Sequence, residues 1–151
     1  MFSLDNSPAY FRYYAGTIRL EVEQADEVVG HKLDLATGMF VPASQDEIRT
    51  VLAGSDNPDF EELTQQGFVQ ATEESRRRHL RGEGTVFPIY EVIDALHSRA
   101  KEEGRRLRAE ESAFVDLLYR QTFEIWEHEV ASRTAGQPPT FTCGPKDSPQ
   151  P

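Results

Sequence analysis

The sequence lacks several features that would point directly to a class of protein. Its one cysteine, Cys143, excludes an internal disulfide and any zinc site made of cysteines. No apolar stretch approaches the ~18 residues that span a bilayer, and residues 1–10 contain neither the basic region nor the apolar run of a secretory signal. We therefore expect a cytoplasmic protein that has no membrane partner.

Basic residues are also scarce, because 16 Lys and Arg stand against 26 Asp and Glu, a net charge of −10. The imbalance is uneven: residues 1–74 hold four basic and fourteen acidic residues, whereas residues 75–108 hold nine basic and five acidic ones. An acidic half repels nucleic acid and attracts basic protein surfaces. The expected partner is therefore a protein with a basic surface, bound through the acidic residues Glu21, Glu23, Asp59, Glu61 and Glu62. The alternative is that these acids only keep the strand soluble and that the partner binds over the aromatic residues near Tyr10 to Tyr14.

What is present supports one domain. Leu, Ile, Val and Phe make up about 23% of the 151 residues, above the roughly 20% below which charged chains tend to remain disordered. Residues 137–151 hold five of the nine prolines. We therefore predict a single globular domain over residues 1–136 and an extended, disordered tail over residues 137–151.

The first half of the domain shows strand patterns. Apolar and polar residues alternate from Thr17 to Glu23, as in a strand with one buried face. Residues 32–41 follow the pattern of a hairpin that turns at Ala36-Thr37-Gly38, and Pro42 ends its second strand. These patterns predict an antiparallel meander of about three strands.

From Ser44 onward the sequence is helical. Ser44-Gln-Asp-Glu47 matches a capping box, and Asn57-Pro58 is a second helix start. A further helix is expected at residues 72–81, ended by Gly82. Another begins at about Phe87 and has an apolar stripe from Ile89 through Val92 to Ala100, and the last covers residues 108–132. The longest one carries Phe114, Leu117, Leu118 and Trp126 and should be the central core element. The predicted fold class is α+β, a small meander followed by four to five helices.

Two other functions remain open. The run Arg76, Arg77, Arg78 and Arg81 could bind an anion or nucleic acid, although cations in the last turn of a helix also stabilise its dipole. His97, with Asp94, and His128, with Glu124 and Glu127, could serve a small hydrolase or a metal-dependent enzyme. The metalloprotease, nucleophile-elbow and phosphate-loop motifs are absent. We accordingly assign no catalytic residue and expect no metal or cofactor.

One local resemblance concerns Arg78-His-Leu-Arg-Gly-Glu-Gly-Thr-Val-Phe-Pro-Ile-Tyr-Glu-Val-Ile-Asp-Ala-Leu96. It resembles a stretch common in small bacterial antitoxins, in which a helix ends in Gly and a helix with Pro near its start follows. Any two helices joined in this way share those elements, so no family is assigned from it. Small size, acidity and the lack of a catalytic motif favour a non-catalytic interaction module of the bacterial type, such as an immunity or antitoxin-like inhibitor or an adaptor.

Overall fold

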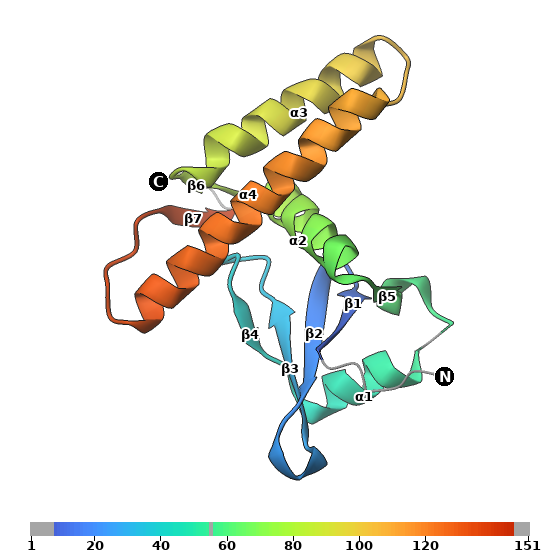
Figure 1. The fold of residues 1–151 in the computed structure, drawn as a ribbon, viewed down its shortest axis with the longest axis vertical. Coiled ribbons are helices and arrows are strands. Elements are labelled where there is room, and N and C mark those ends of the chain that lie inside the picture. Colours follow the sequence, from blue (N-terminus) through green and yellow to red (C-terminus); the bar gives the residue numbers. More distant parts are fainter. Residues whose placement is uncertain (1–7, 55, 147–151) are drawn as a thin grey trace.

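A five-stranded antiparallel sheet forms one end of the molecule in the computed structural model, which describes residues 8–54 and 56–146 (Figure 1). Its strand order is β4-β3-β2-β1-β5. The first four strands follow one another as a meander, and the fifth joins the far edge beside β1. The strands are β1 (Ala9–Tyr13), β2 (Gly16–Val22), β3 (Val28–Leu33), β4 (Phe40–Pro42) and β5 (Glu62–Leu63), and the one-turn helix η2 (Gln24–Asp26) precedes β3.

The alternating pattern of residues 17–23 predicted β2 correctly. Ile18 and Leu20 are fully buried on one face of the sheet, and Thr17 is fully buried on the other. The predicted hairpin is confirmed as β3 and β4, with Gly38 at a φ of 76° in the turn. The meander has one strand more than expected, because the aromatic segment before Gly16 forms β1.

Helix α1 (Gln45–Ala53) covers one face of the sheet, and both hydrogen bonds of the predicted capping box at its start are present. Ile48 and Val51 pack there against Ile18 and Leu20. The helix expected at Asn57-Pro58 is a single turn, η3 (Pro58–Phe60), because the chain then enters β5 and pairs with β1.

Helix α2 (Gln65–His79) lies on the opposite face of the sheet, between the sheet and the last two helices (Figure 1). The Thr17 and Thr72 hydroxyls are 2.7 Å apart across this contact. The helix begins earlier than the predicted residue 72 because the Thr64 side chain accepts a hydrogen bond from the Gly67 backbone N–H. Gly82, expected to end it, lies instead in strand β6 (Leu80–Glu83).

Helices α3 (Val86–Glu102) and α4 (Ala109–Thr134) form an antiparallel hairpin that projects beyond α2 (Figure 1). Leu118 and Trp126 are buried between these elements, as predicted. The expectation of a buried apolar stripe is wrong for Val92, Phe114 and Leu117, because their side chains lie on the open side of the hairpin and are 47%, 45% and 42% exposed. No helix in the described residues is long and apolar enough to cross a membrane.

The predicted tail needs a correction. Thr142–Pro145 forms strand β7, which pairs antiparallel with β6, and the Phe141 ring is buried against Trp126 at 4.8 Å between ring centroids. The described part of the tail, residues 137–146, is therefore attached to the domain, and residues 147–151 lie outside the described residues. The mixed α+β class is confirmed, with four α-helices in the described part of the chain.

Candidate functional site

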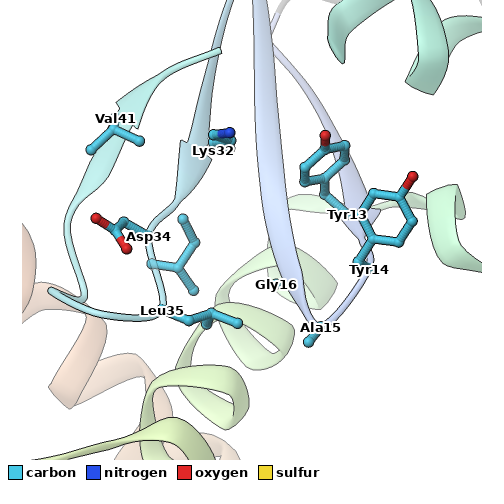
Figure 2. Close-up of a pocket in the computed structure, with 9 residues that line it drawn as sticks. Tyr13, Tyr14, Ala15, Gly16, Lys32, Asp34, Leu35 and Val41 are labelled. Carbon is cyan, nitrogen blue, oxygen red and sulfur yellow. The ribbon is translucent and has the colours of Figure 1, made fainter. Parts of the chain in front are cut away.

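An open trough of about 470 Å³ lies on the α1 side of the sheet, over the part that α1 leaves uncovered (Figure 2). The β1–β2 turn forms one wall, with Tyr13 and Tyr14, and residues 32–35 with Val41 form the other. Gly16 lies between the walls (Figure 2). Because Gly16 has no side chain, the space between the two hairpin tips stays open.

The upper end of the trough is fixed by a polar contact with α1. One oxygen of the Glu47 carboxylate accepts hydrogen bonds from the Lys32 ammonium and, at 3.0 Å, from the Tyr13 hydroxyl. The Lys32 contact, followed by the Ser44 backbone N–H, lowers the pKa of Glu47 to about 2. Burial, followed by the hydrogen bond to Glu47, raises the pKa of Tyr13 to about 12. The trough therefore presents a neutral phenol and a lysine ammonium that is paired with the Glu47 carboxylate.

Tyr14 occupies an unusual position on the rim of the trough. It is the first of two residues in the β1–β2 turn, its φ is 54°, and its side chain is 58% exposed. Positive φ at the first residue of a two-residue hairpin turn favours Gly, because a side chain is strained there. A large aromatic side chain held at this position and left facing water is an observation that points to a role in binding.

One carboxylate lines the trough, and two more acidic residues lie in the segment beside its Tyr14 wall. Asp34 lines it directly, and one of its oxygens accepts a hydrogen bond from the Ala36 backbone N–H at 2.9 Å. Asp59 lies beside Tyr14, because its backbone carbonyl accepts a hydrogen bond from the Tyr14 N–H. Glu61, the next acid along, is paired with Arg12 at 3.2 Å.

The five acids expected to bind a partner do not form one surface. Asp59 lies beside Tyr14, and Glu61 and Glu62 follow along the outer edge of β1. Glu21 and Glu23 lie toward the other end of β2, about 20 Å from the trough at ~3.3 Å per residue. Glu21 is paired with Arg19 at 3.1 Å. The structure thus divides the predicted site into two groups, of which only one adjoins the trough.

The arginine run is also divided. Arg76 is fully buried: its guanidinium donates to Glu73 at 2.7 Å and to the Gly38 carbonyl at 2.9 Å, and it lies 4.3 Å from the Trp126 ring centroid. The other Glu73 oxygen accepts a hydrogen bond from the Tyr90 hydroxyl at 2.7 Å, which in turn accepts one from the Trp126 ring N–H. Arg76 is therefore part of a core network rather than an accessible anion site.

The other three arginines point to different neighbours. Arg77 donates to Asp94 and to the Tyr119 hydroxyl, and Arg81 lies in β6. Arg78 lines a small polar pocket with Arg12 and His79, where it faces Glu74 at 3.8 Å. The four arginines therefore do not converge on one ligand.

The two histidine clusters lie on the surface of the protein. His97 and His128 are exposed, and the Asp94 carboxylate near His97 is taken by Arg77. In the described parts of the chain, no group of three or more His, Cys, Asp or Glu side chains could hold a metal ion.

Comparisons with models of protein families, with curated proteins and with solved structures found no match to this chain. Sequence reasoning missed Lys32 and Asp34, and it considered Tyr13 and Tyr14 only as part of an alternative docking surface, the aromatic segment from Tyr10 to Tyr14. The available signal was the two-residue interval between Tyr13 and Gly16, which is the length of a tight hairpin turn.

Proposed function

We propose that the protein is a non-catalytic interaction module that binds a basic segment of a partner protein, and that the trough is the docking site. The observation that carries the proposal is the exposed Tyr14 ring, which sits in a strained backbone position at the rim of an open trough. Aromatic residues that are held rigidly and left accessible are typical of binding surfaces.

The side chains of the trough suit arginine or lysine. A cation over the Tyr14 ring gains about 0.5–1 kcal/mol at an exposed site. A second basic side chain of the same segment can lie with its aliphatic stem along Leu35 and Val41 and its charged end at the Asp34 carboxylate, on the opposite wall. The negative charge of Asp59, beside Tyr14, adds long-range attraction that raises the association rate.

A titration of the isotope-labelled protein with a short arginine-rich peptide tests this proposal by nuclear magnetic resonance. We expect the largest shift changes at residues 13–16 and 32–35, and none with a glutamate-rich peptide of the same length. Changes confined to other parts of the protein would contradict the proposal.

Two variants of one residue provide the matched control. Tyr14→Phe keeps the ring and should bind the peptide as the wild type does. Tyr14→Asn removes the ring but tolerates positive φ, so the fold should be retained while binding weakens several-fold. Equal binding by both variants would show that the ring takes no part.

A further inference from the structure

The α3–α4 hairpin exposes apolar side chains on one side only. At 100° per residue, Ile89, Val92 and Leu96 fall on one stripe of α3, and Phe114, Leu117 and Ile125 fall on one stripe of α4. Val92, Phe114 and Leu117 are three of the four exposed large hydrophobic side chains in the described residues. The fourth is Tyr14, in the trough.

Both stripes lie on the side of the hairpin that faces away from α2. Asp94 of α3 and Tyr119 of α4 both contact Arg77 of α2, which identifies the side of each helix that faces α2. The two stripes lie about 160° around their helices from these residues. Together they form one apolar face, in which Val92, Phe114 and Leu117 are exposed while Ile89, Leu96 and Ile125 are half-buried at its inner edge against the core.

The pattern of this face is complementary to itself. Along α4 its members are Glu110, Phe114, Leu117, Gln121, Ile125 and His128, all within about 80° of the helix circumference. When a second α4 runs antiparallel about the midpoint of this series, Phe114 meets Ile125, Leu117 meets Gln121, and Glu110 meets His128. Phe114 and Ile125 then form an apolar contact on each side of the centre, Leu117 packs on the aliphatic part of Gln121 at the centre, and a carboxylate faces an imidazole at each end.

The midpoint of the α3 stripe and the midpoint of the α4 series lie equally far along the hairpin. Val92 lies ten residues before Glu102, the end of α3, and Tyr119 lies ten residues after Ala109, the start of α4. Both residues are therefore equally far from the turn that joins the helices. One two-fold axis across the hairpin at this height brings Val92 beside its own copy and Ile89 opposite Leu96 of the second molecule.

We propose that this face binds a second copy of the chain, so that two hairpins pack into an antiparallel four-helix bundle. The α4 series from Glu110 to His128 is about 27 Å long and the helix pair is about 20 Å wide, so the face covers roughly 540 Å², about two thirds of the ~800 Å² per partner of a standard interface. The trough lies on the sheet, on the other side of α2 from the hairpin, and the face described above points away from α2, so the trough stays open in this dimer. The dimer is thus independent of the proposed function.

Sedimentation velocity of the full chain tests the proposal. The wild type should sediment as a dimer, and Leu117→Glu should give a folded monomer because it places two charges inside the interface. The control, Ser98→Glu, adds the same charge at an exposed position on the far side of α3 and should remain a dimer. A monomeric wild type, or a dimer that survives Leu117→Glu, would overturn the proposal.

Cross-linking provides a second readout that does not depend on how Leu117→Glu folds. Val92→Cys should form an intermolecular disulfide on mild oxidation, because the two-fold axis brings position 92 beside its copy. Ser98→Cys, and the wild type with Cys143 alone, should remain uncross-linked. Equal cross-linking at positions 92 and 98 would count against this interface.

Discussion

The Glu73–Arg76 pair shows how single residues hold the parts of the fold together. Both side chains are fully buried, and their contacts join α2 to α3 through Tyr90, to α4 through Trp126 and to the β3–β4 turn through Gly38. One Arg76 nitrogen has no hydrogen-bond partner among the described residues, and the aromatic rings around the guanidinium provide the compensating contact. Burial, with the Glu73 carboxylate next to it, raises the pKa of Tyr90 and keeps its hydroxyl protonated.

Removal of one member of this pair should be more damaging than removal of both. Glu73→Leu or Arg76→Met alone leaves an unpaired buried charge and should lower the free energy of unfolding by about 3–5 kcal/mol. The double variant Glu73→Leu with Arg76→Met should lose less stability than either single variant, because it leaves no buried charge unpaired. Denaturant titration of the four proteins measures this, and additive losses would show that the two charges do not interact.

The Glu47 carboxylate predicts a dependence of stability on acid. Its pKa is lowered from 4.5 to about 2 by the Lys32 hydrogen bond first and the Ser44 backbone N–H second. A lowered carboxyl pKa contributes stability that is present above about pH 4.5 and is lost as the pH falls through about 2. Glu47→Gln should therefore be less stable than the wild type at pH 7, and the two should converge near pH 2.

Melting curves at several pH values measure this difference. The matched control is Glu62→Gln, at an exposed position without an ion pair among the described residues, whose stability should stay within ~0.5 kcal/mol of the wild type throughout. A constant gap between Glu47→Gln and the wild type down to pH 2 would contradict the assigned role of Glu47.

At the scale of elements, the C-terminal segment closes the helical core. Phe141 packs on Trp126 and Phe87, and the Glu129 carboxylate accepts hydrogen bonds from the backbone N–H and hydroxyl of Thr140. Truncation after Gly136 should therefore destabilise the domain, and Phe141→Ala alone should reduce the free energy of unfolding by about 3–5 kcal/mol. Trp126, the single tryptophan, reports the loss by its fluorescence.

Two glycines in the same strand pair provide a matched comparison. A methyl group at Gly82 would overlap the Thr142 carbonyl oxygen of β7, whereas one at Gly144 would meet nothing within 4 Å. Gly82→Ala should therefore change the Trp126 emission as truncation does, and Gly144→Ala should not. Identical behaviour of the two variants would show that β6–β7 pairing contributes little.

An element could be predicted from the sequence when the residues that specify it lie close together in the chain. The alternation in β2, the turn before β4 and the Ser44 cap all act within a few residues, and each predicted its element. The β6–β7 pair joins Gly82 to Cys143, and the local pattern of apolar and polar residues does not indicate which distant segment a strand pairs with. Proline-rich composition therefore suggested a tail where Phe141 in fact packs on the core.

The candidate site could not be predicted from the sequence for the same reason. Tyr13, Lys32 and Glu47 come from two hairpin tips and a helix start, and only the folded sheet brings them together. Charge counting correctly identified the acidic half of the chain but could not show that Glu21 and Asp59 lie at different ends of the sheet.

At the scale of the whole molecule, two accessible surfaces lie on either side of α2, which separates the sheet from the α3–α4 hairpin (Figure 1). The sheet presents the trough, and the hairpin presents its apolar face. Each surface is proposed for a different partner, a basic protein segment for the first and a second copy for the second. The charge imbalance of residues 1–74 places most of the negative potential on the sheet end, where a basic partner would arrive.

The most direct test of the central claim removes two charges at either end of the sheet and compares binding of the arginine-rich peptide at low salt. We predict that the double variant Asp34→Asn with Asp59→Asn raises the dissociation constant ~10-fold, an effect that should shrink as salt screens charges beyond ~8 Å. The double variant Glu21→Gln with Glu23→Gln removes the same net charge about 20 Å away and should change the dissociation constant by less than ~2-fold. The reverse order would place the binding site at the β2–β3 end of the sheet and contradict the account.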